Sequence, residues 1–276
     1  ILGGSANYFS LAASIYSPVR VVGVVGQDYK PEHRGWLEQR KVDLRGLQQV
    51  PGLTFHWEGK YENDMNEAIT LVTDLNVFEN FHPAIPPEYK NSEVVFLANI
   101  DPVLQLQVLE QVQKPRLIAA DTMNYWIQSK KKDLFKVLER IDVLLINENE
   151  LRQLTDSWNT IRAAKDVIKM GPKAVVIKRG EYGFVMFCED RFFILPAFPV
   201  EEVVDPTGAG DTFAGGFLGH LAQIDRPWNR EDLKQACVHG CLLASFTVQD
   251  FGVEGIRRAT MKDLEERLEA YRKVIS

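Results

Sequence analysis

The sequence predicts an α/β fold in which helices cover both faces of a mostly parallel sheet. The main support is a series of short, nearly continuous apolar runs, the pattern of strands that are buried on both faces. Segments with helical spacing, such as 102–113 and 134–140, lie between most of these runs, and this alternation is typical of βαβ units. The runs lie at residues 20–26, 94–97, 117–120, 143–146 and 174–177.

Two pairs of segments interrupt this alternation. Residues 54–61 and 68–75 alternate apolar and polar side chains like half-exposed antiparallel strands, which predicts a small sheet at one edge of the fold. Residues 184–188 and 191–195 predict a second hairpin. In a sheet of this class, ligands bind beyond the carboxyl ends of the strands, and each candidate site residue follows one of the apolar runs.

The composition fits a globular protein whose surface does not bind nucleic acid or membranes. The 276 residues suffice for one large α/β domain or for a domain with a small appendage. The net charge of −6 argues against a nucleic-acid or anionic-membrane partner, and no apolar run approaches the length of a membrane span. The three cysteines are too few and too scattered for a disulfide framework, so we expect a reducing, cytoplasmic location.

Residues 203–217 say more about function than any other segment. An apolar strand ends at Asp205, a Gly-Ala-Gly turn follows, and Asp211 stands where a helix begins. Glycines allow the sharp turn, and the free N–H groups of a helix's first turn attract a phosphate or a developing anion. Asp211 is placed to take a proton from a hydroxyl group, which predicts phosphoryl transfer to an alcohol. The alternative is a plain helix start, because aspartate is also a favoured N-cap residue.

Three further segments combine glycines, amides or carboxylates at a helix start or a turn. Gly3 and Gly4 permit close approach of a ligand, and Asn7 offers hydrogen bonds to hydroxyl groups. The Asn-Glu-Asn-Glu segment 147–150 carries hard oxygen ligands suited to Mg²⁺ or its waters. Residues 178–183 lie between a strand and a hairpin. Each segment also has a structural explanation, as a helix start in the first two cases and as a hairpin turn in the third.

Residues 205–213, Asp-Pro-Thr-Gly-Ala-Gly-Asp-Thr-Phe, closely resemble the C-terminal signature of the ribokinase-like (PfkB-type) carbohydrate kinases. Gly3-Gly4 with Asn7 is similar to the N-terminal signature of that family. The resemblance covers most of the chain and implies a three-layer α/β/α fold with a small β-sheet lid. It places the lid at residues 46–81, by position only, and the kinase domain at 1–45 and 82–276. It also implies transfer of the ATP γ-phosphoryl group, with Mg²⁺, to a hydroxyl of a sugar or sugar-like substrate.

Roles carry over from the family to the matching positions of this chain. The resemblance implies that Asp211 is the catalytic base. The anion hole for the transferred group is formed by the amides of Gly208, Ala209 and Gly210. The acceptor side comprises Gly3, Gly4, Asn7 and Asn124. The nucleotide side comprises Asn147, Glu150, Lys178, Gly180, Gly183 and Ser245, and Glu150 also organises Mg²⁺ through water. Asp205 and Thr207 match positions that bind a monovalent cation, such as K⁺, in some members.

The identity of the acceptor stays open. An adenosine-type nucleoside kinase shares every motif used above, and Tyr8 and Phe9 fit a large aromatic acceptor pocket. A sugar- or nucleotide-binding regulator without turnover is a further alternative, which the intact residues 205–213 disfavour. The lid often makes the dimer contact in this family, which implies a homodimer through the lid. Family members begin with a strand that supplies an aspartate to the acceptor, so we expect that this strand is missing upstream of Ile1.

Overall fold

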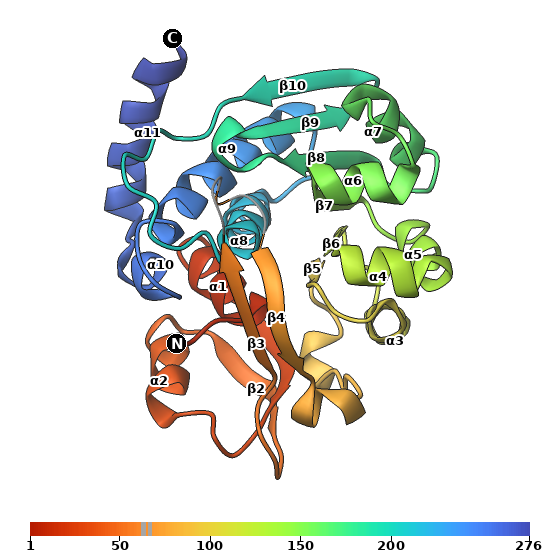
Figure 1. Ribbon diagram of the computed structural model, residues 1–276, viewed down its shortest axis with the longest axis vertical. Coiled ribbons are helices and arrows are strands. Elements are labelled where there is room, and N and C mark those ends of the chain that lie inside the picture. The colour runs from red at the N-terminus through yellow and green to blue at the C-terminus, as the bar shows by residue number, and fades with distance from the viewer. Residues whose placement is uncertain (62–64, 66–67) are drawn as a thin grey trace.

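The centre of the molecule is a six-stranded sheet, seen in a computed structural model that describes residues 1–61, 65 and 68–276 (Figure 1). The strand order is β10-β9-β8-β7-β6-β5, in which β5 to β8 are parallel and β9 and β10 are antiparallel. The predicted mostly parallel sheet and the predicted hairpin are therefore confirmed. The strands are β5 (Val94–Leu97), β6 (Leu117–Asp121), β7 (Val143–Asn147), β8 (Ala174–Lys178), β9 (Phe184–Cys188) and β10 (Arg191–Leu195).

Helices cover both faces of this sheet, as the sequence predicts. In Figure 1 the strands separate α4 to α7 from α8 and α9. One face carries α3 (Pro102–Gln111), α4 (Asn124–Ser129), α5 (Lys131–Leu138), α6 (Glu148–Thr155) and α7 (Thr160–Ile168). The other face carries α1 (Ser5–Ala13), α8 (Ala209–Ala222) and α9 (Arg230–Thr247). The remaining helices are α2 (Pro31–Gln39), α10 (Glu254–Arg258), α11 (Met261–Ile275) and the 3-10 turns η1 (Asn76–Asn80), η2 (Pro87–Tyr89) and η3 (Gly180–Tyr182).

Alternate residues of each central strand enter two different apolar clusters. Leu144 and Ile146 of β7 pack against α5, α6 and α7, whereas Val143 and Leu145 pack on the side of α8 and α9. All four side chains are fully buried. A strand that buries both faces needs apolar residues at every position, which is why the sequence shows continuous runs rather than alternation. This packing fixes the strands whose carboxyl ends carry polar residues.

The predicted strand at 20–26 does not join the six-stranded sheet. It forms β1 (Arg20–Val25), which pairs in parallel with β2 (Asp43–Gln49) as a separate two-stranded sheet, with α2 between them in the chain. The sequence analysis did not predict β2, and the proposed lid boundary at residue 46 falls inside it. Gly46 allows the close pairing, because a side chain there would overlap the backbone carbonyl of Val21.

The predicted small antiparallel sheet is confirmed as β3 (His56–Tyr61) paired with β4 (Ala68–Asp74). Residues 62–64 and 66–67 of the predicted lid lie outside the described residues. The base of the ribbon is tied to the turn after β1, because the Asp28 carboxylate accepts hydrogen bonds from the Thr54 N–H at 2.7 Å and from its hydroxyl at 2.6 Å. The two orange strands in Figure 1 run from this base towards α1 and α8.

Candidate active site

Three neighbouring strands end in polar residues at the same edge of the sheet. Asp121 is the last residue of β6, Asn147 of β7 and Lys178 of β8. Asn147 and Lys178 are paired directly across β7 and β8. Because the carboxyl ends of parallel strands meet at one edge, these side chains converge on the space beside the N-terminal end of α8.

The turn before α8 needs glycine at one position. Gly208 has φ 78°, in the left-handed region, and a side chain there would overlap the ring of Tyr8. The Asp205 carboxylate holds the turn by accepting the Thr207 N–H at 2.9 Å. The N–H of Ala209 donates to the Pro206 carbonyl at 3.1 Å.

Three amides of this turn therefore stay available to a ligand. Among the backbone hydrogen bonds of the described residues, none uses the N–H groups of Gly208, Gly210 or Asp211. They belong to the start of α8, where the helix dipole adds partial positive charge. Of the three amides expected to form an anion hole, those of Gly208 and Gly210 have no backbone partner among the described residues, whereas the Ala209 N–H bonds the Pro206 carbonyl.

Asp211 occupies the first turn of α8 and stays partly accessible to solvent. Desolvation, followed by the negative charge of Asp121, raises the pKa of Asp211 from 3.8 to about 6. The ammonium group of Lys178 and a hydrogen bond from the Ser5 hydroxyl act in the opposite direction. A carboxyl group with this pKa is ionised at neutral pH yet basic enough to accept a proton from an alcohol in a transition state.

A buried ion pair lies next to Asp211. The Lys178 Nζ is 2.7 Å from Asp121 Oδ2, and the two side chains are only 17% and 6% exposed. Burial alone would lower the pKa of Lys178, but the carboxylates of Asp121, Glu150 and Asp211 outweigh it and raise that pKa. Lys178 therefore carries a permanent positive charge in the middle of three acidic groups.

Asn147 and Glu150 form a capping box at the start of α6. The Asn147 Oδ1 accepts the Glu150 N–H at 2.8 Å, and Glu150 Oε2 accepts the Asn147 N–H at 2.9 Å. The structural explanation considered for this segment is thus correct, although it leaves room for a role with phosphates. Burial, followed by the charge of Asp121, raises the pKa of Glu150 to about 7.

The charge balance of this cluster fits a divalent cation. Asp121, Glu150 and Asp211 surround a single ammonium group, so the cluster has excess negative charge when all groups are ionised. Within the described residues, no group of three histidine, cysteine or acidic side chains is arranged to hold a metal ion by itself. Mg²⁺ commonly uses one or two carboxylates and completes its shell with water and substrate phosphates. The residues present fit that mode of binding.

The predicted acceptor-side residues Gly3, Gly4 and Asn7 lie at the start of α1, next to Asp211. Gly4 has φ 90°, and the Asn7 amide donates to the Gly3 carbonyl at 2.7 Å. Ser5 links this helix start to Asp211 through its hydroxyl group. The structure thus brings the N-terminal motif and the motif at 205–213 together, although they are about two hundred residues apart in the chain.

Two contacts at the site were not predicted, although Tyr8 was considered as part of an aromatic acceptor pocket. The ring of Tyr8 packs beneath Gly208, and the Tyr61 hydroxyl at the end of β3 is 3.1 Å from the Thr207 hydroxyl. The β3–β4 ribbon therefore contacts the turn before α8. No sequence signal marks Tyr61, since its importance follows only from how the ribbon folds over the sheet.

The remaining predicted residues have other contacts in the structure. Asn124 is exposed and accepts the N–H of Tyr125 at 2.8 Å. Gly183 has φ 84° and packs against the backbone at the end of β10. The hairpin alone therefore explains why this residue is glycine. The Ser245 hydroxyl is buried, donates to the Leu242 carbonyl at 2.6 Å and is 2.7 Å from the Arg267 guanidinium. Gly180, with φ 55°, begins η3.

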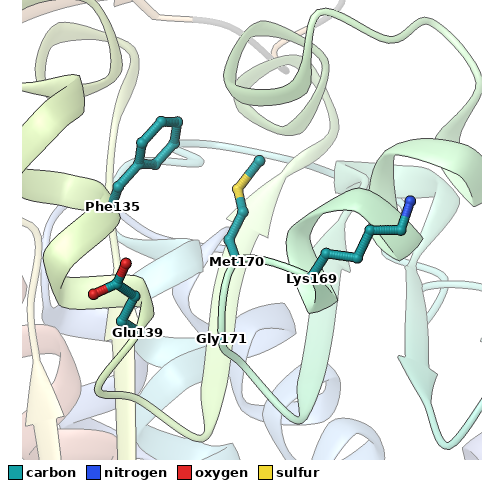
Figure 2. A pocket seen from close by; sticks show the side chains of 5 residues that line it. All are labelled: Phe135, Glu139, Lys169, Met170 and Gly171. Atoms are coloured by element: carbon teal, nitrogen blue, oxygen red, sulfur yellow. The ribbon is translucent and has the colours of Figure 1, made fainter.

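A hollow lies near the amino ends of β7 and β8, away from this cluster, and Figure 2 shows the residues that line it. It is lined by Phe135, Glu139, Lys169, Met170 and Gly171, between the end of α5 and the turn that precedes β8. Figure 2 shows the Lys169 side chain directed away from the other four residues, and its ammonium group is bonded to Asp166 at 2.7 Å. The hollow thus lacks convergent polar groups, and the site remains at the carboxyl edge.

The site combines a carboxylate that can accept a proton, unbonded amides at a helix start and an acidic cluster suited to a divalent cation. This combination is typical of a phosphotransferase with an alcohol group as acceptor. Comparison with known proteins agrees. The family of pfkB carbohydrate kinases matches residues 1–258. The chain belongs to this family and is an ATP-dependent kinase of a sugar or nucleoside hydroxyl group. The expected family and fold are therefore confirmed.

Individual relatives give the same picture. A cytidine kinase of Thermococcus kodakarensis is 32% identical over 223 residues, which cover 78% of each chain. The structure of the nucleoside kinase of Methanocaldococcus jannaschii superposes with a TM-score of 0.78 at 22% identity, covering 97% of this chain and 86% of that one. A putative ribokinase II of E. coli, solved with ATP and Mg²⁺, gives 0.81 at 20% identity, covering 97% and 89%. Within the described part of the chain, none of the helices combines the length and apolar character needed to span a bilayer.

Proposed function

We propose that this enzyme transfers the γ-phosphoryl group of Mg²⁺-bound ATP to a hydroxyl of a sugar or sugar-like acceptor, with Asp211 as the base. The observation that carries the proposal is the position of Asp211 in the first turn of α8, beside the free amides of Gly208 and Gly210. Asp211 takes the proton of the acceptor hydroxyl, and the amides stabilise the charge that develops on the transferred phosphoryl oxygens.

We place the other predicted residues around this centre as follows. Asn147 and Glu150 orient the Mg²⁺ and phosphate groups, and bound Mg²⁺ neutralises charge on the phosphates. Asn147 fixes the Glu150 backbone through the capping box, which holds both side chains at the start of α6. We assign the nucleotide side to Lys178, Gly180, Gly183 and Ser245. We assign the acceptor side to Gly3, Gly4, Asn7 and Asn124, beneath a lid that includes the β3–β4 ribbon and begins after β2 rather than at residue 46.

A nucleoside is the second candidate acceptor, favoured by one observation. The relative that is 32% identical over 78% of this chain is a cytidine kinase.

The decisive experiment measures coupled ADP release with a panel of sugars, sugar acids and nucleosides, with Asp211→Asn in parallel. Turnover of one acceptor that disappears in the variant identifies the substrate class. Nucleotide binding without turnover of any acceptor would instead favour a regulator.

The pH dependence of the rate tests the assignment of the base. Asp211 must be ionised to accept a proton, and its pKa is raised to about 6, so kcat/KM should fall as the pH drops below about 6. Asp121→Asn removes a neighbouring negative charge and should move this acid limb to lower pH. Glu150 faces the same cluster and has a pKa of about 7, so it could also cause a fall in rate at low pH. In Glu150→Gln, the fall that remains is due to Asp211. The charged and polar groups that face Asp211 are Asp121, Lys178, Glu150, Ser5 and Tyr8. An acid limb unmoved by Asp121→Asn would contradict the assignment.

We further propose a monovalent-cation site at Asp205 and Thr207, supported by their position in the turn before α8. Asp205 Oδ2 accepts the Gly252 N–H at 3.3 Å, and the Thr207 hydroxyl contacts Tyr61, so both oxygens are ordered at this turn. Replacing K⁺ by Na⁺ or by an organic cation in the turnover assay tests the site. Equal rates in all three salts would contradict the proposed monovalent-cation site.

We also propose a homodimer that forms through the lid. Its support is the exposure of Ile69 and Leu71 on β4, at 44% and 52%, on a ribbon with apolar side chains that face solvent. Leu71→Asp should shift the mass measured by light scattering from dimer to monomer, whereas a wild-type monomer at all concentrations would contradict the proposal.

A cytoplasmic location is supported by Cys188, Cys237 and Cys241, which are all unpaired.

A further inference from the structure

Two lysine–aspartate pairs lie at opposite edges of the same sheet. At the amino edge, the Lys173 Nζ is 2.7 Å from Asp142, and the lysine side chain is 68% exposed. At the carboxyl edge, the Lys178–Asp121 pair has the same length, but its lysine is only 17% exposed. An exposed pair forms at little cost, whereas a buried pair must offset the loss of hydration of both ions. Burial of the second pair therefore needs a reason other than stability.

The geometry of the buried pair is also unusual. Lys178 ends β8 and Asp121 ends β6, and β7 lies between these two strands. The lysine side chain thus crosses the end of a neighbouring strand to reach its partner. Both oxygens of Asp121 are engaged, because Oδ1 accepts the Thr122 N–H at 2.9 Å while Oδ2 binds the ammonium group. Asp121 is therefore a fixed anchor that holds the ammonium group in one place.

That place is the start of α8. A Cβ atom on Gly210 would lie 3.0 Å from Lys178 Nζ, so the ammonium group stands directly beside Gly210. The free N–H groups of Gly210 and Asp211 belong to the same turn. An ammonium group has three donors, and the bond to Asp121 uses one of them. Within the described part of the chain the other two donors have no partner, so they can follow a phosphate oxygen that arrives at these amides.

We propose that Lys178 is a catalytic residue whose ammonium group contacts the transferred phosphoryl group, and that Asp121 is the residue that positions it. The inference rests on the proposed function. In the reaction, the acceptor oxygen forms a bond to the γ-phosphorus while the bond to the bridging oxygen breaks. ADP leaves with that electron pair, the acceptor proton passes to Asp211, and Lys178 keeps its protons. A compact ammonium charge suits phosphoryl oxygens whose positions change during transfer.

A purely structural ion pair makes a different prediction. If the pair only neutralises charge, removal of both partners should be tolerated much better than removal of one, because no charge is left buried alone. If Lys178 acts on the phosphoryl group, removal of Asp121 as well cannot restore its function. The double variant therefore separates the two roles.

The test compares Lys178→Met, Asp121→Asn and the double variant, with Lys173→Met as the matched control at the amino edge. We expect Lys178→Met to lower kcat by about 10²–10³-fold, the effect of losing one donor to a transition-state oxyanion. The double variant should regain thermal stability relative to Lys178→Met but stay as slow. Lys173→Met should keep the wild-type kcat. Recovery of the wild-type kcat by the double variant would overturn the assignment.

Nucleotide binding gives a second readout that needs no acceptor. By calorimetry, Lys178→Met should bind a non-hydrolysable ATP analogue with Mg²⁺ about 10–100-fold more weakly than wild type, since one charge-assisted hydrogen bond is lost. Its affinity for ADP with Mg²⁺ should be unchanged. Equal losses for both nucleotides would refute contact with the terminal phosphoryl group. If the wild type binds neither nucleotide, the proposed function itself fails, whereas wild-type turnover with an unaffected variant refutes only the role of Lys178.

Discussion

Replacement of Asp211 by asparagine is expected to slow phosphoryl transfer by about 10²–10⁴-fold, the usual effect of losing a general base. The side chains have the same shape, so the fold and the affinity for nucleotide should be retained. Stability should not fall at neutral pH. The folded state raises the pKa of Asp211 from 3.8 to about 6, so its ionisation destabilises the fold as the pH rises through this window. At pH 8 the variant should unfold at an equal or higher urea concentration.

Asp263→Asn is a position-matched control for this experiment. Asp263 is also the third residue of a helix, in the capping box of α11, and it is half-buried. Its replacement removes a carboxylate from a helix's first turn without touching the site, so turnover should stay at the wild-type level. Near-wild-type turnover by Asp211→Asn would show that another group accepts the proton.

Replacement of Gly208 by alanine should have the second large effect. At φ 78° an alanine is strained, and its methyl group would overlap the ring of Tyr8, which is 1% exposed. Together these effects should lower the free energy of unfolding by about 2–4 kcal/mol. Displacement of the turn should also lower kcat by roughly 10²–10³-fold, because the amides of the anion hole move with it. Urea unfolding and steady-state kinetics measure the two effects separately.

Gly35→Ala provides the contrast. Gly35 lies within α2, and a Cβ atom there would meet no atom within 4 Å. The substitution should stabilise the protein by about 0.5–1 kcal/mol, since alanine favours helices, and should leave kcat unchanged. If Gly208→Ala behaved like Gly35→Ala, the turn before α8 would not require glycine.

The sequence predicts those parts of this protein that short-range patterns determine. The apolar runs locate the four parallel strands because strands buried on both faces cannot contain polar residues. The predicted polar ends of β7 and β8 also lie at the site, because the carboxyl edge of such a sheet is where its loops converge. The glycine at 208 is predictable because only a particular backbone conformation permits the turn.

Long-range choices could not be read in the same way. The run at 20–26 identifies a strand but not its partner. That partner is β2, which could not be recognised because its polar residues interrupt the apolar pattern of a buried strand. The Lys178–Asp121 pair crosses a strand and joins residues 57 positions apart, so no local spacing reveals it. The same holds for the contact between Tyr61 and Thr207. Such contacts depend on the folded arrangement rather than on the residues beside them in the chain.

The contact between Tyr61 and Thr207 joins the β3–β4 ribbon to the turn before α8, so the proposed lid and the proposed phosphate-binding turn are directly connected. If β3 moved outward, this 3.1 Å hydrogen bond would break, and the turn before α8 would lose one of its contacts. A single neutral hydrogen bond contributes roughly 1 kcal/mol, which alone favours the shut position only about fivefold. A hydrogen bond of this strength can break at thermal energies, so it would not by itself hold the ribbon against the turn.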